Sequence, residues 1–195
     1  MPEKEKPVHP RKIEIVEAAV TCFLERGYHQ TGVRDIAKQA GVSLGNLYNH
    51  FKGKEDVLAF IAEIEVEETG HFIELLVEPN DPLAALEQFI YEYAIYISHP
   101  ENALLGVEIL TEAIRNPMIS DVFGKNRTRL VDALVSCLNK GIKLRVFASY
   151  DDLSTIAFMM LDTLEGRGIR NLEQSTIDET SIRSLQSFIL NGLKL

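Results

Sequence analysis

Residues 33–51, VRDIAKQAGVSLGNLYNHF, decide the fold of the N-terminal part of the chain. The apolar residues at the start of this stretch have the i, i+3, i+4, i+7 spacing of a buried helix face: Val33, Ile36, Ala37 and Ala40. Gly41 can adopt the positive φ that ends a helix, and Ser43 is a preferred N-cap whose oxygen can accept the amide of Asn46. The stretch therefore predicts two short helices joined by a tight turn, and the second helix begins at Leu44.

The second of these helices has a polar outer face. Only Leu47 and Phe51 are expected to point inward, which leaves on the outside or at the flanks Gly45, Asn46, Tyr48, Asn49 and His50. Gly45 lets the backbone come close to another surface, and the first helical turn offers free N–H groups to phosphate oxygens. This arrangement is typical of a helix-turn-helix, whose second helix enters the major groove of DNA. The alternative is an ordinary helical hairpin with a polar face.

The stretch from Arg11 to Leu58 resembles the N-terminal DNA-binding domain of TetR-family transcriptional repressors. The resemblance rests on linked motifs: Thr31-Gly-Val-Arg-Asp-Ile-Ala37, Ala40-Gly-Val-Ser43, Leu47-Tyr48, His50-Phe51 and Lys54-Glu55. The remainder of the chain is similar only in length, helical character and the weaker run 112–117. Two positions depart from the usual pattern: Gly32, where a second Thr or Ser is frequent, and Leu44, where a polar or basic residue is. Leu44 can offer DNA only an apolar contact, for example to a thymine methyl group.

The outward face and the resemblance together predict which residues contact DNA. These residues are Thr31, Arg34, Ser43, Leu44, Gly45, Asn46, Tyr48, Asn49, His50 and Lys54. Phosphate contacts, which give affinity without selectivity, are expected from Tyr48, His50 and Lys54. Base contacts, which give selectivity, are expected from Arg34, Asn46 and Asn49. Gly45 is expected to set the distance of approach.

The distribution of charge supports a DNA-binding N-terminus. The net charge of the whole chain is −9, which by itself argues against a nucleic-acid partner. Residues 1–54, however, hold nine Lys and Arg against six Asp and Glu, a net charge of +3. Residues 55–195 hold eleven against twenty-three, a net charge of −12. A basic end on an acidic body orients the molecule on DNA.

Several other classes of protein and site find no support. No apolar run approaches the ~18–20 residues of a membrane span, and the polar start is no signal peptide, so we expect a cytoplasmic protein. The five His and two Cys show no metal-binding spacing, and neither a phosphate loop nor a nucleophile motif is present. We therefore predict no metal, no cofactor and no catalytic residue.

Helical periodicity continues along the rest of the chain without strand alternation, so the predicted fold is all-α. We expect a three-helix DNA-binding domain over residues 1–54, with residues 1–9 as a flexible arm. Residues 55–195 are expected to form a helical bundle for effector binding and dimerisation. One long helix should run from Lys54 past Leu76, and further helices over about 83–97, 102–115, 117–141, 152–166 and 177–193.

The last two helices are apolar on more than one face, which the surface helix of a monomer does not need. The resemblance implies a homodimer in which these helices pair with their two-fold mates. Such a dimer presents two recognition helices to the half-sites of a palindromic operator. The residues expected in the interface are Ile156, Met160, Leu164, Ile182, Leu185, Phe188 and Ile189. The alternative is that both helices fill the core of a single chain.

The resemblance also implies a small-molecule effector pocket in the C-terminal half. The candidate residues are Tyr93, Glu108, Phe123, Met159 and Asp162. The aromatic and methionine side chains among them are equally typical of plain core. Glu108 and Asp162 lie among apolar residues, where an unpaired charge is costly. They predict a mostly apolar effector that carries a positive charge, or else structural pairing with arginines or across the dimer.

The sequence therefore predicts a homodimeric transcriptional repressor that a small effector releases from its operator. Two alternatives are a helical enzyme, with Glu108 and Asp162 in its pocket, and an all-helical scaffold that binds partner helices. The enzyme lacks a nucleophile, base or metal arrangement. The scaffold leaves the polar outer face of the second helix unexplained.

Overall fold

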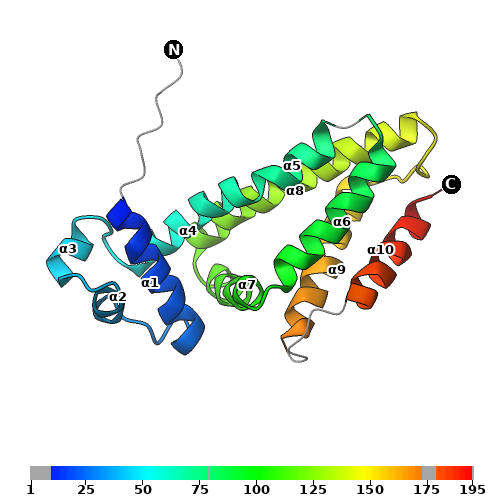
Figure 1. The fold of residues 1–195 in the computed structure, drawn as a ribbon. Helices are drawn as coiled ribbons and strands as arrows, with labels where there is room; N and C mark the ends of the chain where they lie inside the picture. Colours follow the sequence, from blue (N-terminus) through cyan, green and yellow to red (C-terminus); the bar gives the residue numbers. More distant parts are fainter. Residues whose placement is uncertain (1–9, 79, 173–178, 195) are drawn as a thin grey trace, which may run out of the picture.

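The computed structural model describes residues 10–78, 80–172 and 179–194, so the predicted arm of residues 1–9 lies outside the described residues. The described chain is an elongated array of helices with the N-terminal helices at one end (Figure 1). In chain order they are α1 (Pro10–Arg26), α2 (Val33–Gln39), α3 (Leu44–Tyr48), α4 (Lys54–Glu68), α5 (Gly70–Val77), α6 (Pro82–Ser98), α7 (Pro100–Ala113), α8 (Pro117–Lys143), α9 (Leu153–Asn171) and α10 (Glu179–Leu193). The all-α prediction is confirmed.

The N-terminal helices share one core with the first half of α4. Ile15, Ile36, Leu47 and Val57, one from each of these four helices, are fully buried in it. Ile119, from the start of α8, belongs to the same cluster. The core therefore extends beyond Lys54, and α4 runs directly from the DNA-binding end into the body.

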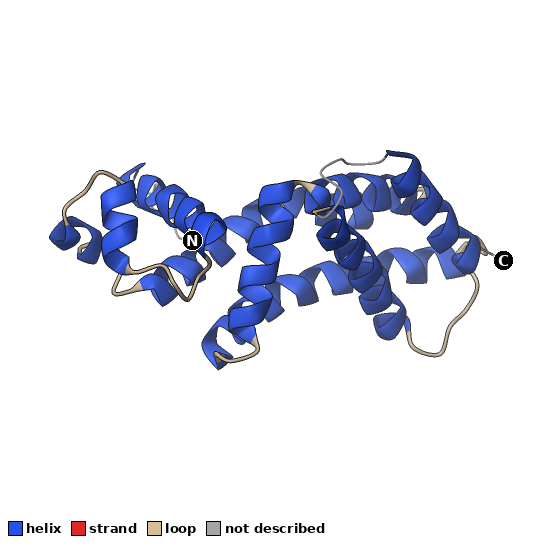
Figure 2. Cartoon of the chain, turned by 90° about the horizontal axis from the view of Figure 1, so that it is seen from below, coloured by secondary structure: helices blue, strands red, loops and turns tan. Residues whose placement is uncertain are grey.

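A second, larger core fills the body. Helix α6 lies at its centre and packs against α5, α8, α9 and α10, and Figure 2 shows only helices and loops over the described residues. Leu86, Phe89 and Leu161 are fully buried there. Where α9 crosses the end of α6, a Cβ on Gly168 would lie 2.6 Å from the Ile97 carbonyl oxygen, so this contact requires glycine. Among the described helices, none combines the length and the apolar character needed to cross a membrane.

Three helices differ from their predicted extents. The long helix expected from Lys54 is interrupted at Thr69, which separates α4 from α5. The Thr69 hydroxyl donates to the Glu65 carbonyl oxygen at 2.6 Å, a side-chain bond of the kind that bends helices. Helix α9 continues to Asn171, beyond the predicted end at Gly166, and α3 ends already at Tyr48. The interruption matters most, because it divides the predicted rigid link between the two ends of the molecule.

Candidate nucleic-acid interface

The turn and the short helix α3 have the predicted local chemistry. Gly41 has a φ of +64°, and the Ser43 side chain accepts the Asn46 N–H at 3.1 Å. Leu47 is completely buried and Phe51 is 2% exposed. The predicted turn, cap and two inward anchors of the helix-turn-helix are confirmed.

The outer face of α3 is open. Tyr48 is 52% exposed, and Asn49 and Gly45 are exposed beside it. Apart from the two neighbouring residues and the nearby backbone of α3, no heavy atom lies within 4 Å of the position that a Cβ on Gly45 would take. Arg34 of α2 is also exposed, whereas Ser43 gives its oxygen to the cap and Leu44 is half-buried against the N-terminal core. The face can therefore meet a large flat partner at close range.

Two residues near α3 are less open than the sequence suggested. Asn46 is half-buried, and its Oδ1 is buried without a hydrogen-bond partner in the described structure. Asn46 therefore offers less of its side chain to the outer face than the exposed Tyr48 and Asn49 do. His50 is half-buried beyond the end of α3.

Two of the predicted DNA contacts, Thr31 and Lys54, are wrong. Thr31 is 2% exposed, and its hydroxyl donates to the carbonyl oxygens of Cys22 (3.1 Å) and Gly27 (2.9 Å). The Lys54 ammonium donates to the carbonyl oxygens of Tyr28 (2.8 Å) and Thr31 (3.3 Å) and lies 4.2 Å from the centre of the Tyr28 ring. Both polar groups hold the loop between α1 and α2 instead of facing outward.

Replacing Lys54 with alanine is expected to destabilise the N-terminal core. The change removes hydrogen bonds from a charged donor, each worth about 1.5–3 kcal/mol, and a cation–π contact. Urea unfolding should show the loss, and binding to specific and random DNA should fall together. Lys52→Ala, which removes the same charge from an exposed neighbouring position, is the control. If the two variants were equally stable, Lys54 would not stabilise the N-terminal core, and the original prediction that it binds phosphate would stand.

The predicted dimer contacts divide into buried and exposed residues. Four of them lie inside the core of the single chain, so their assignment to the interface is corrected: Met160, Leu164, Ile182 and Ile189. Ile156 and Leu185 are half-buried and pack against the same core. Phe188 is 74% exposed, and α9 adds Met159 (58%) and Phe158 (40%). Helical periodicity identified apolar helices correctly but not which of their faces lies inside the chain.

The five predicted effector residues do not converge on one site. Glu108 accepts the backbone N–H of Tyr28 at 2.8 Å and so faces the DNA-binding end. Phe123 packs against the N-terminal core, and Met159 is exposed. Asp162 is 70% exposed and pairs with Arg127 at 2.6 Å. Only Tyr93 lies in the core of the body.

A polar group around Tyr93 was missed by the sequence reasoning. The Tyr93 hydroxyl donates to Glu165 (3.1 Å), and Arg127 pairs with the same carboxylate. Asn126 donates to both the Ala62 carbonyl oxygen and the Glu65 carboxylate, each at 2.7 Å. Glu65 follows Ile61 by one helical turn, so it occupies a position that the apolar stripe of α4 would otherwise fill. That interruption of the stripe was the available signal.

Burial raises the pKa of Glu65 above its ordinary value of 4.5, an effect that the Asn126 hydrogen bond opposes only in part. The folded protein therefore holds the proton more tightly than the unfolded chain. The stabilising contribution is complete below pH 4.5 and is lost as the pH rises through the raised pKa.

Glu65→Gln is accordingly expected to raise the melting temperature at neutral pH, because glutamine avoids the buried charge and still accepts from Asn126. The difference from the unmodified protein should shrink as the pH falls toward 4.5. Thermal unfolding at several pH values measures it, with Glu67→Gln at an exposed position of the same helix as the control. A variant that is less stable at every pH would contradict the argument.

No group of three or more His, Cys, Asp or Glu suited to a metal ion occurs among the described residues. Cys22 and Cys137 are free and buried, and burial raises the pKa of Cys137 to about 11. A thiol with so high a pKa is inert at neutral pH.

Comparisons with known proteins agree with this geometry. Residues 15–60 match the model of the bacterial regulatory proteins of the tetR family. The HTH-type transcriptional repressor KstR2 of Rhodococcus jostii (strain RHA1) is 31% identical over 189 residues, which cover 94% of this chain and 91% of that protein. The fatty acid metabolism regulator protein of Bacillus subtilis (strain 168) is 45% identical over 101 residues, 52% of this chain and only 49% of that protein.

A solved structure shares the fold over almost the whole chain. The transcriptional regulator FadR from Bacillus subtilis, in complex with stearoyl-CoA, has a TM-score of 0.76 at 24% identity, over 92% of this chain and 98% of that chain. The likeness to KstR2 extends through both the helix-turn-helix and the body, which an enzyme or a scaffold protein would not account for. The chain belongs to the TetR family and is a DNA-binding transcriptional repressor, not an enzyme.

Proposed function

We propose that the protein is a cytoplasmic homodimer that binds a palindromic operator through α3 and is released by a long-chain acyl-CoA. Residues 1–54 carry the DNA contacts, and residues 55–195 carry the dimer interface and the effector site. The observation that carries the first part is the open outer face of α3, which is held by Leu47 and Phe51 at the basic end of an otherwise acidic molecule.

The division of DNA contacts follows exposure. Exposed Arg34 and Asn49, together with the half-buried Asn46, read base edges. Tyr48 and His50 bind phosphate groups. Gly45 allows the backbone of α3 to approach the groove closely.

The exposed apolar side chains of the last two helices support the homodimer. Phe158, Met159 and Phe188 are large apolar side chains that the single chain leaves exposed. Helices α9 and α10 lie in the part of the body away from α1–α3 (Figure 1). A two-fold contact through them buries these side chains and leaves both recognition helices free for DNA.

The effector class rests on relatives and on the character of the body. One relative is named a fatty acid metabolism regulator, and one solved structure of the same fold holds stearoyl-CoA. A fatty acyl chain suits the apolar and aromatic core around Phe72, Phe89 and Tyr93.

The predicted positive charge of the effector loses its structural basis. It depended on Glu108 and Asp162 lying together in one pocket, but Glu108 binds the Tyr28 amide and Asp162 is exposed beside Arg127. An uncharged apolar chain does not need either carboxylate.

Selection of bound duplexes from a random pool, followed by titration of the selected complex, tests the proposal. Stearoyl-CoA is expected to release the operator, whereas coenzyme A alone and a cationic amphiphile such as dodecyltrimethylammonium are not. Enrichment of a non-palindromic sequence would contradict the dimer on DNA. Release by the cationic amphiphile but not by stearoyl-CoA would contradict the effector class.

A further inference from the structure

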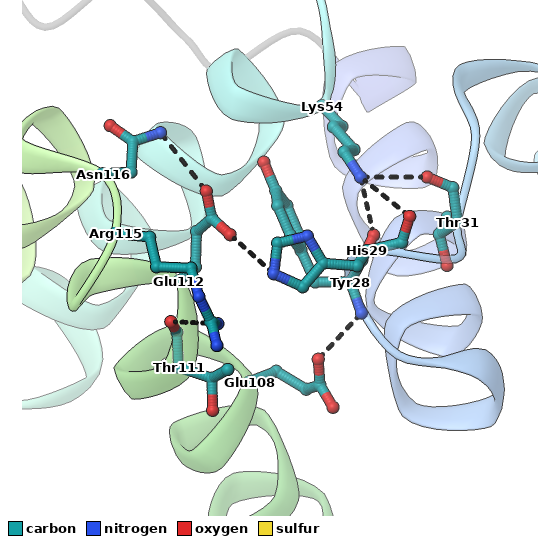
Figure 3. A network of polar contacts seen from close by, with 9 residues as sticks. All are labelled: Tyr28, His29, Thr31, Lys54, Glu108, Thr111, Glu112, Arg115 and Asn116. Carbon is teal, nitrogen blue, oxygen red and sulfur yellow. Dashed lines mark hydrogen bonds and ion pairs between the residues drawn. The ribbon is translucent and has the colours of Figure 1, made fainter.

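The loop that joins α1 to α2 is held from the body as well as from its own domain (Figure 3). Gly27 ends α1 with a φ of +84°, which turns the chain so that the N–H of Tyr28 points toward α7. Glu108 of α7 accepts this N–H at 2.8 Å. A Cβ on Gly27 would lie 3.6 Å from the Glu108 carboxylate oxygens, so the carboxylate rests against the turn itself.

A second contact joins the same two elements one turn further along α7. The Nε2 of His29 lies 3.3 Å from Oε2 of Glu112. Glu112 is only 8% exposed, and its other carboxylate oxygen accepts from Asn116 at 3.4 Å. Oε2 makes no hydrogen bond in the described structure, so its contact with His29 is an ion pair, formed when the imidazole is protonated. Glu108 and Glu112 therefore contact consecutive residues of the loop, Tyr28 and His29.

Lys54 holds the opposite side of the loop. Its ammonium donates to the Tyr28 and Thr31 carbonyl oxygens, so the loop lies between a cation of α4 and two carboxylates of α7 (Figure 3). The loop leads directly into α2, and the N–H of Gly32, the residue before α2, donates to the Asp35 carboxylate at 2.9 Å. Helices α2 and α3 are joined by a tight turn. A shift of the loop therefore moves the recognition helix.

Helix α7 connects this loop to the body. It packs against α1 on one side and against α6, α8 and α9 on the other. Helix α4 and the start of α8 also join the DNA-binding end to the body, since α4 packs against α8 and Ile119 lies in the N-terminal core. The contacts from α7 add a further point of attachment on the loop itself, which limits rotation of the DNA-binding end.

We propose that Glu108, assisted by Glu112, is a positioning residue for DNA binding: it fixes the angle of the DNA-binding end on the body and thereby sets the half-site spacing that the dimer accepts. The proposal rests on the proposed dimer on a palindromic operator. A hydrogen bond to a carboxylate is stronger than one between neutral groups, so the contact can resist rotation. In this role neither carboxylate contacts DNA.

A spacing series tests the proposal. Operators are made from the selected palindrome with the half-sites moved closer or further apart by one or two base pairs, and their affinities are measured by fluorescence anisotropy. Glu108→Ala is expected to reduce the preference for the best spacing by about tenfold, the equivalent of one lost charge-assisted hydrogen bond. Its affinity for an isolated half-site should stay the same. Glu108→Gln should keep most of the preference, because its amide oxygen still accepts from Tyr28.

Two further variants complete the design. Glu101→Ala removes an exposed acid from the first turn of the same helix and should leave the spacing preference intact. His29→Ala removes the second contact from an exposed position and should weaken the preference in the same direction, which keeps the proposal testable if Glu108→Ala fails to fold. Hydrogen exchange of the Tyr28 amide should become faster in Glu108→Ala and not in Glu101→Ala.

The outcomes separate the two proposals. If the unmodified protein has a spacing preference that Glu108→Ala and His29→Ala both retain, the role of α7 is refuted and the dimeric repressor stands. If the unmodified protein has no spacing preference, the dimer on a palindrome and the role of α7 both fall.

Discussion

Replacing Gly45 with glutamate is expected to abolish operator binding and to leave the fold intact. Gly45 lies in the first turn of α3 with open space where its Cβ would be, so a larger side chain meets nothing within the protein. Glutamate is also a better helix former than glycine and is favourable in a first turn. On DNA the same side chain keeps the backbone away from the groove and places a carboxylate against phosphate groups. An unpaired charge in an interface costs on the order of 3 kcal/mol or more, a loss of at least about a hundredfold in affinity.

Gly124→Glu is the matched control, because Gly124 is likewise helical, exposed and without close neighbours but lies in α8 of the body. Both variants carry the same added charge. Circular dichroism and thermal unfolding should find both folded, and anisotropy with the selected operator should find only Gly45→Glu defective. If Gly45→Glu bound the operator about as tightly as Gly124→Glu, α3 would not be the element in the groove.

The helix-turn-helix could be predicted because its determinants are local. Gly41, the Ser43 cap and the two anchors Leu47 and Phe51 all act within a few residues of one another, so sequence spacing contains the geometry. Thr31 and Lys54 lie in the same motif but were assigned wrongly. Their partners are carbonyl oxygens of a loop, and spacing does not tell which polar groups a loop will use.

The helices of the body could be predicted from the sequence, but the way in which they pack against one another could not. An apolar stripe shows that one side of a helix is covered, but it does not identify the covering element. For this reason Met160 of the chain's own core and the exposed Phe188 looked alike in sequence. The same limit applies to acids in apolar runs: Glu108 is explained by a backbone amide eighty residues away, and Glu65 by an asparagine on α8.

The dimer interface is best tested at a residue that contributes little to the core of the single chain. Phe188→Arg is expected to turn the dimer into a monomer, because Phe188 is 74% exposed in the chain alone and contributes little to its core. Full burial of a phenylalanine is worth about 1.5–3 kcal/mol, and the two-fold axis doubles that contribution. Loss of both side chains, with two charges placed in their stead, raises the dimer dissociation constant by at least about a hundredfold. Leu185→Arg is not equivalent, since Leu185 packs against the core of its own chain.

Val77→Arg provides the control for the dimer prediction, since Val77 is also apolar and is 50% exposed, but it lies on α5. Sedimentation over a wide concentration range should find the unmodified protein and Val77→Arg dimeric and Phe188→Arg monomeric. The Phe188→Arg monomer should still be folded and unfold in a cooperative melting transition. Operator affinity of Phe188→Arg should fall to that of an isolated half-site, because two recognition helices on separate chains no longer bind as one unit. A Phe188→Arg protein that remains dimeric and holds the full operator would place the interface on another face of the body.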